Sequence, residues 1–177
     1  MNVSFENLSF VISIAHGPEQ VRLFQNINLD ELKYKYVNGR GRGLEYKVPE
    51  SPSNLPEVLP ETSELTRYSG NCHCGAVTFA FLVPSLDHVK VGNCDCSICT
   101  RNGYLCVYPD RKEVAFHTGY DNLRPYLFGE KKMTHKFCPT CGSSVMIDFH
   151  GGPCVVEGGD RLAINVGIGD IRAASFC

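Results

Sequence analysis

The chain has 177 residues, 43% of them hydrophobic and 20% charged, which suits one folded domain with an appendage and argues against wholesale disorder. The 17 basic and 19 acidic residues give a net charge of −2, which argues against a general nucleic-acid binder or a polybasic membrane binder. No stretch approaches the roughly 20 apolar residues of a membrane span.

The first predicted elements precede a proline-rich stretch. Apolar runs predict strands at 8–15 and 20–24, and residues 29–35 predict a short helix with Asn28 as its N-cap. Residues 48–66 carry four prolines among Ser, Glu and Asn, which is typical of an extended linker. The sequence therefore predicts three parts: an N-terminal segment at 1–47, a linker at 48–66 and a cysteine-bearing module at 67–177.

Within the module, the predicted elements are short strands separated by turns. Runs of β-branched and aromatic residues predict the strands, and glycine, Asn-Gly and Pro-Asp sequences separate them. Residues 96–102 favour a helical turn. The predicted fold class is therefore mainly β, with little helix and with the cysteines on loops. The predicted strands are 76–83, 89–91, 104–108, 114–117, 124–128, 144–149 and 161–166.

Ten cysteines are the unusual part of the composition, since dense cysteine indicates either disulfides or bound metal. Seven of them form three groups: Cys72 and Cys74; Cys94, Cys96 and Cys99; Cys138 and Cys141. Thiols one or two residues apart can direct both sulfurs at one cation about 2.3 Å away, whereas a local disulfide at that spacing is strained. The apolar run at 10–15 follows Glu6 and has no basic leader, so it does not resemble a secretory signal. We therefore expect a cytoplasmic protein whose clustered cysteines hold zinc.

The number seven fits one closed and one open zinc site. A structural zinc takes four protein ligands, and a catalytic zinc takes three and keeps an open position. The two outer groups would make the closed site and the middle group the open one. The middle site could also be closed by another side chain, and spacing leaves this alternative open; the candidates are His73, His88, Asp95 and His117. The isolated Cys106 and Cys154 are predicted to be core thiols.

With this cysteine layout, the module resembles the glutathione-dependent formaldehyde-activating enzyme family, which includes centromere protein V. The resemblance rests on ordered motifs at 68–79, 94–103, 135–143 and 159–166. It implies a β-tent fold of small antiparallel sheets around two zinc ions. It assigns Cys72, Cys74, Cys138 and Cys141 to a structural zinc. It assigns Cys94, Cys96 and Cys99 to a catalytic zinc with an open position.

The N-terminal segment resembles the C-terminal tail of the same family. Residues 20–33 and 38–44 carry this resemblance, although the tail normally follows the strand that here ends at Val166. The segment is either the remnant of a preceding copy in a tandem array or a permuted tail that folds back onto the module. Fold-back is favoured, because an unpaired edge of apolar strands promotes aggregation.

The resemblance implies glutathione and formaldehyde as partners, while the thiolate centre itself implies a thiol and a small electrophile. Zinc lowers the pKa of a bound thiol, and the thiolate can attack an aldehyde carbon to form a hemithioacetal. We therefore predict a carbon–sulfur lyase for thiol–aldehyde adducts such as S-hydroxymethylglutathione. His73 and Asp95 flank predicted ligands and could orient them. The alternatives are a non-catalytic zinc-stabilised binding module and a biosynthetic enzyme for another thiol adduct; the oligomeric state is left open.

Overall fold

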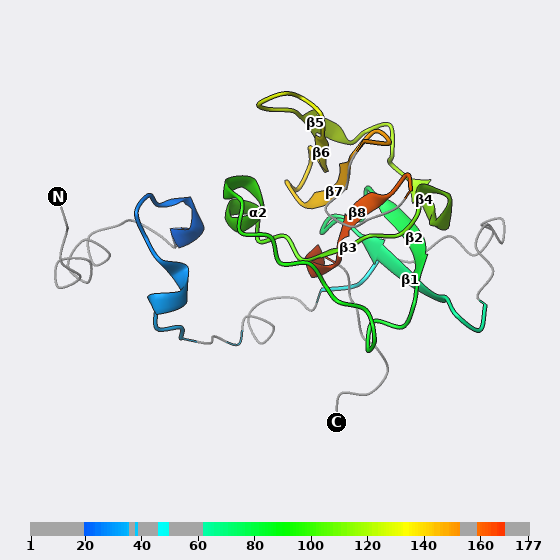
Figure 1. Ribbon diagram of the computed structural model, residues 1–177, viewed down its shortest axis with the longest axis horizontal. Helices are drawn as coiled ribbons and strands as arrows, with labels where there is room; N and C mark the ends of the chain where they lie inside the picture. The colour runs from blue at the N-terminus through cyan, green and yellow to red at the C-terminus, as the bar shows by residue number, and fades with distance from the viewer. Residues whose placement is uncertain (1–19, 36–37, 39–45, 50–61, 153–158, 169–177) are drawn as a thin grey trace. The chain divides into compact units, whose positions relative to one another are not determined.

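The computed structural model describes residues 20–35, 38, 46–49, 62–152 and 159–168 (Figure 1). The chain divides into two units, Met1–Val37 and Asn38–Cys177. Cys154 and the strand predicted at 8–15 lie outside the described residues. Among the residues that are described, no helix has the length and apolar character that a membrane crossing requires.

The described part of the first unit contains two short 3-10 helices, η2 (Val21–Leu23) and η3 (Leu29–Glu31). The strand predicted at 20–24 is wrong: the amide of Leu23 bonds the carbonyl of Gln20 at 3.0 Å, which makes a local turn. The Asn28 cap is confirmed, because its side chain accepts from the amide of Asp30 at 3.1 Å. The helix itself is shorter than predicted.

This early end has a local cause. The carbonyl of Leu29 accepts from the amide of Leu32 at 3.2 Å and from the hydroxyl of Tyr34 at 2.8 Å. An α-helix would instead direct that carbonyl to the amide four residues on. Residues 20–35 therefore contain no strand, and the origin of the 1–47 segment remains a prediction.

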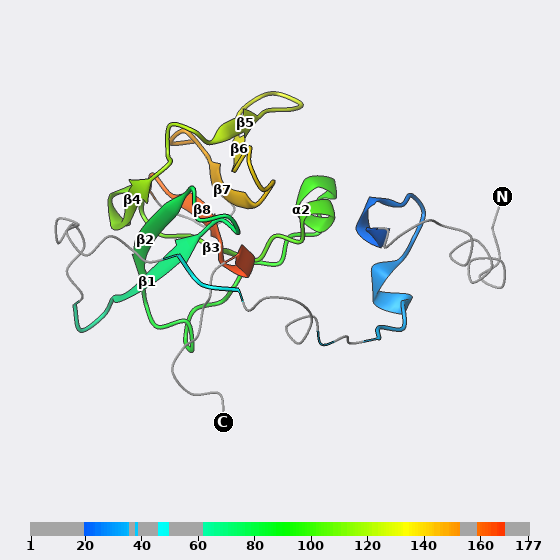
Figure 2. The same cartoon turned by 180° about the vertical axis from the view of Figure 1, so that it is seen from behind.

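The second unit contains two antiparallel sheets, which confirms the mainly β fold class (Figures 1 and 2). The first sheet has the order β1-β2-β4, with β1 at Thr66–Asn71, β2 at Thr78–Val83 and β4 at Val114–Thr118. The second has the order β3-β8-β7-β6-β5, with β3 at Cys106–Val107, β8 at Leu162–Asn165, β7 at Ser144–Asp148, β6 at Thr134–Phe137 and β5 at Arg124–Tyr126. The helical turn predicted at 96–102 is the helix α2, Ser97–Asn102. Two further 3-10 helices are η4 (Arg111–Glu113) and η5 (Val166–Ile168).

Three local predictions about strands differ from the structure. Residues 89–91 are not a strand, because the amides of His88 and Val89 both bond the carbonyl of Ser85 in a turn.

The sequence pattern does not predict β1, whose Gly70 and Asn71 are typical turn residues. Gly70 is accommodated because it lies against the ring of Phe79, where an added Cβ would stand 2.6 Å from Cζ. Strand β6 is also missed, since its sequence Thr-His-Lys-Phe is largely polar.

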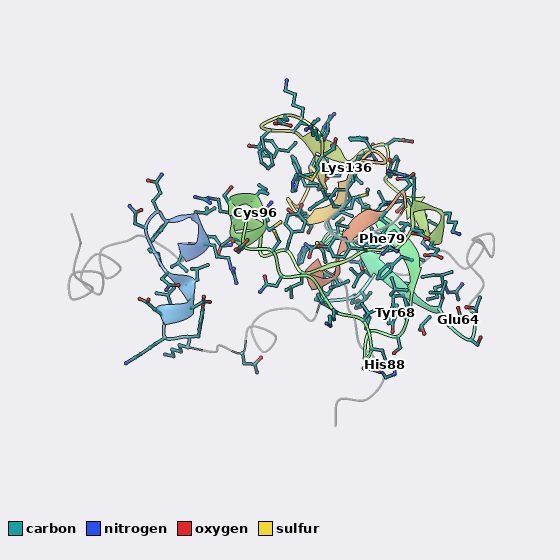
Figure 3. All side chains as sticks on the ribbon, viewed as in Figure 1. Glu64, Tyr68, Phe79, His88, Cys96 and Lys136 are labelled. Carbon is teal, nitrogen blue, oxygen red and sulfur yellow. The ribbon has the colours of Figure 1, made fainter. Side chains whose placement is uncertain are left out.

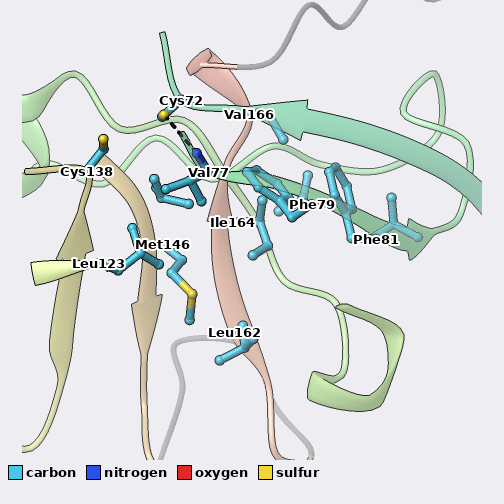
Figure 4. Close-up of a cluster of buried hydrophobic side chains, with 13 residues drawn as sticks. Cys72, Val77, Phe79, Phe81, Leu123, Cys138, Met146, Leu162, Ile164 and Val166 are labelled. Carbon is cyan, nitrogen blue, oxygen red and sulfur yellow. Dashed lines mark hydrogen bonds between the residues drawn. The ribbon is translucent and has the colours of Figure 1, made fainter. Parts of the chain in front are cut away.

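The second sheet separates two buried clusters, because side chains alternate between the faces of a strand. Met146 and Ile164 pair across β7 and β8 and belong to the larger cluster, here called the main core (Figure 4). Their chain neighbours Ile147 and Ala163 also pair but belong to the second core. The second core consists of Cys99, Tyr104, Cys106, Ile147, Phe149 and Ala163. Each face of the sheet therefore supports a different group of cysteines.

A partly buried ion pair joins η4 to β7. Asp148 is 4% exposed and receives two hydrogen bonds from the Arg111 guanidinium, at 2.6 and 3.2 Å. Arg111 also contacts Asp160 at 2.8 Å, so it links three chain segments. Burial alone would raise the pKa of Asp148, but the Arg111 contact outweighs burial and lowers it.

Replacing Asp148 with Asn is expected to lower the free energy of unfolding by about 2 kcal/mol, because Arg111 loses its buried charged partner. Since the Arg111 side chain is 35% exposed, solvent screening keeps the cost below that of a fully buried pair. The lowered pKa means that the stabilisation is fully present above the ordinary value of 3.8 and is lost as the pH falls below it. Denaturant unfolding at neutral pH measures the cost. The control is Glu130→Gln at the exposed pair with Lys132, which should leave stability unchanged.

Candidate metal centres

The two outer cysteine groups meet in a four-cysteine centre. Cys72 and Cys74 lie on the turn from β1 to β2, and Cys138 and Cys141 lie on the turn from β6 to β7. Their four sulfurs all lie within 4.8 Å of one another. The Cys72–Cys74 Sγ distance is 3.6 Å and the Cys74–Cys138 Sγ distance is 3.8 Å.

These distances fit zinc rather than disulfides. Four sulfurs each about 2.3 Å from one tetrahedral zinc ion lie about 3.8 Å from one another. A disulfide would bring two sulfurs to about 2.05 Å. All four cysteines are free thiols. The donor set and its dimensions therefore suit one closed metal centre.

The same backbone pattern builds both turns of the centre. The amide of Cys72 bonds the carbonyl of Val77, and the amide of Cys138 bonds the carbonyl of Ser143, each at 2.9 Å. The amides of Gly75 and Gly142 donate to the carbonyls of Cys72 and Cys138, respectively, also at 2.9 Å. Both glycines have a positive φ, +77° and +74°, which other residues rarely adopt. Each turn thus has its own hydrogen bonds and glycine to position its two cysteines.

The pKa values of the thiols reflect how closely the four sulfurs lie together. Burial, together with the neighbouring thiols, raises the pKa of Cys72 to about 12, although the amide of Val77 donates to its sulfur at 3.3 Å. Burial also raises the pKa of Cys141, but hydrogen bonds that the Ser143 hydroxyl and nearby amides donate to its sulfur lower that pKa to about 5. A divalent ion would compensate the charge that four deprotonated thiols bring together.

Residues 46–49 lie against the Cys72–Cys74 turn. The Tyr46 hydroxyl donates to the carbonyl of His73 at 2.9 Å and accepts from the Asn71 side chain at 3.0 Å. The Tyr46 ring stacks on His73 with 5.0 Å between centroids. Pro49 lies against Gly75, whose added Cβ would stand 2.6 Å from the Pro49 Cγ. This short segment therefore packs on the four-cysteine centre, while the predicted division at residues 47 and 66 remains a prediction.

The middle group forms a three-cysteine centre at the start of α2. Cys96 is the N-cap of this helix (Figure 3). Cys99 lies in its first turn, so the spacing of three places both on one side. The sulfurs of Cys94, Cys96 and Cys99 lie within 4.8 Å of one another. Cys99 is buried, whereas Cys96 is exposed. The centre is therefore anchored on one side and open to solvent on the other.

The four candidates for a closing ligand do not join this centre. In the part of the chain that the structure describes, the group contains only the three cysteines, and no ligand atom comes from His73, His88, Asp95 or His117. Burial raises the pKa of Cys99. Cys96 is also affected by burial, but the amide of Cys99 and the neighbouring thiols lower its pKa. The three thiols fit zinc with one coordination position left for an external ligand.

A buried histidine contacts the second core through Tyr104, and no spacing in the sequence marks it. His135 is 4% exposed, and its ring meets the edge of Tyr104 at 5.8 Å between centroids. Tyr104 belongs to the second core together with Cys99. Burial raises the pKa of Tyr104 to about 12, while the Ser144 hydroxyl and the Asn102 amide oppose this rise. The only sequence signal for His135 is its place at the start of the third motif.

Two comparisons relate the chain to known proteins. The family model described as glutathione-dependent formaldehyde-activating enzyme matches residues 67–173, which is more than half of the chain. A crystal structure of a Rhodobacter sphaeroides protein is similar at 29% identity, over 58% of this chain and 88% of that chain, with a TM-score of 0.49. The chain belongs to the glutathione-dependent formaldehyde-activating enzyme family.

Proposed function

We propose that the protein is a zinc-dependent carbon–sulfur lyase that joins a thiol such as glutathione to formaldehyde, or to another small aldehyde, and cleaves the same adduct. The three-cysteine centre carries this proposal. Its three sulfurs lie within 4.8 Å of one another, and its Cys96 is exposed. Family membership supports glutathione and formaldehyde as substrates.

The two centres would have different roles, one structural and one catalytic. Cys72, Cys74, Cys138 and Cys141 would hold a structural zinc, and Cys94, Cys96 and Cys99 would hold a catalytic one. Zinc in the second centre would favour the thiolate form of a substrate thiol that takes its fourth position. The buried Cys99 fixes the centre to the second core, and the exposed Cys96 leaves the substrate a route of approach.

The reaction needs only the two substrates. The substrate sulfur forms a bond to the carbonyl carbon, the carbonyl π pair moves to oxygen, and the thiol proton ends on that oxygen. The reverse steps release thiol and aldehyde. No redox change occurs, which agrees with thiol ligands that must stay reduced. For the same reason we place the protein in a reducing compartment such as the cytoplasm.

Exchange spectroscopy with stepwise metal loading tests this function. Metal-free protein is reconstituted with one or two equivalents of zinc, and NMR follows the exchange of ¹³C-formaldehyde with its glutathione adduct above the spontaneous rate. We expect acceleration that rises with the second equivalent, because the second centre does the chemistry. Two bound zinc ions without acceleration or glutathione binding would favour the non-catalytic binding module. Acceleration with other thiols but not glutathione would favour an enzyme for another thiol adduct.

A further inference from the structure

We propose that His135 contacts the substrate at the three-cysteine centre and carries the proton from the thiol to the carbonyl oxygen. This inference rests on the function proposed above and supplies the acid–base group that the cysteines lack.

Strand register places His135 on the same sheet face as the three-cysteine centre. Across the second sheet, Tyr126 pairs with His135, His135 with Ile147, and Ile147 with Ala163. Directly paired residues in antiparallel strands project from the same face. Ile147 and Ala163 belong to the second core, which also contains Cys99. His135 therefore projects toward this core rather than toward the main core.

The ring contacts of His135 lead from the core to the surface. One contact is with Tyr104, which is buried with Cys99. The other is with Phe128, at 5.5 Å between ring centroids. Phe128 is exposed and stacks on the exposed Tyr126, also at 5.5 Å. His135 thus contacts both a residue of the second core and an aromatic pair that is exposed at the surface.

The Nδ1 atom of His135 has an unmet hydrogen-bonding requirement. It is buried and has no hydrogen-bond partner among the described residues. A buried polar atom without a partner costs about 1–3 kcal/mol, and a hydrogen bond to the substrate would remove this cost. By contrast, the exposed His150 on the same hairpin is satisfied, since its Nε2 lies 2.6 Å from the Thr134 hydroxyl.

A neutral imidazole can move the proton without an outside acid. The thiol S–H gives its proton to Nδ1 as the sulfur binds, the C–S bond forms, and Nδ1 gives the same proton to the oxygen that receives the carbonyl π pair. The ring ends neutral, as it began. Burial lowers the pKa of His135, which keeps its lone pair free when the thiol arrives.

Three variants test the role of His135 in turnover. We expect His135→Phe and His135→Gln to lower kcat by about 10²–10⁴ with little change in KM, since general acid–base groups contribute this much. Both variants should retain two zinc ions. Added imidazole should partly restore the rate of His135→Ala, which leaves room for it. The matched control is His150→Gln, which should keep the wild-type rate. Unchanged kcat in His135→Phe would show that the ring only fills space and would overturn the proposal.

A binding measurement separates this inference from the proposed function. The ¹⁵N signals of the histidine rings are followed while glutathione and then formaldehyde are added, and His135→Gln identifies the His135 signals. We expect the Nδ1 signal to shift with glutathione. A shift without turnover would leave the contact standing and overturn the lyase function. Turnover without any shift would overturn the contact and leave the function standing.

Discussion

Replacing Cys138 with Ser is expected to unfold the sheet-bearing module rather than merely weaken it. Cys138 is 1% exposed and lies in the main core beside Cys72 (Figure 4). A serine oxygen is a poor substitute for a thiolate ligand, so the four-cysteine centre would lose its metal. Structural zinc contributes about 10–16 kcal/mol in small zinc-dependent folds, which matches or exceeds the whole stability of a typical domain.

Circular dichroism and metal analysis measure this outcome. The variant should contain at most one zinc ion per chain and should lose its β signal, as the wild type should with a strong chelator. The comparison is Cys96→Ser, which removes a ligand of the other centre and should keep the β signal. A folded Cys138→Ser protein with wild-type thermal stability would contradict a structural role for the four-cysteine centre.

Replacing Cys96 with Ser is expected to abolish turnover and leave the fold intact. The Cys96 side chain makes no capping hydrogen bond, and serine is among the best N-cap residues, so the change removes no cap from α2. Cys96 is exposed, so the change leaves no cavity in the second core. With two thiols in place of three, the centre should lose its zinc, and we expect the rate to fall by at least about 10³, as for loss of a catalytic metal.

The control for this variant is Cys106→Ala. Cys106 is 3% exposed in the second core, where burial raises its thiol pKa to about 12 and Cys94 is close enough to raise it further. Because Cys106 is a core thiol, the Cys106→Ala variant should still bind two zinc ions and should retain turnover. Loss of the second zinc in Cys106→Ala would identify it as a fourth ligand and would contradict an open centre.

The sequence predicts the local parts of both centres well, because each cysteine group is a short-range feature. Spacing alone indicates which thiols share a turn, and Gly75 and Gly142 mark where the backbone must bend. The grouping of Cys72 with Cys138 required counting and the family resemblance, since pairing across distant turns has no periodic signature. The fold class was predictable for a similar reason: strands such as β2 and β4 carry a dense run of β-branched and aromatic residues.

The remaining features depend on long-range contacts. Strand β1 forms because β2 supplies its partner, and the glycine in its sequence is needed only because Phe79 lies against it. The role of Tyr46 at the four-cysteine centre depends on a contact with His73, 27 residues away. His135 is buried because the register of the second sheet turns its ring toward Tyr104. None of these relations leaves a pattern in the neighbouring residues.

The four-cysteine centre also affects the unfolded chain. Cys74 and Cys138 are 64 residues apart, so one ion bound to both would close a long loop. In the chain-entropy description of cross-links, closing a loop of that length removes freedom from the unfolded state worth roughly 4 kcal/mol. Each turn can bind the ion through its own two sulfurs. The loop would then close when the second turn binds an ion that the first turn already holds. Ion binding would then determine the order of folding. The β1–β2 and β6–β7 hairpins would form first, and the strands between them would fold afterwards.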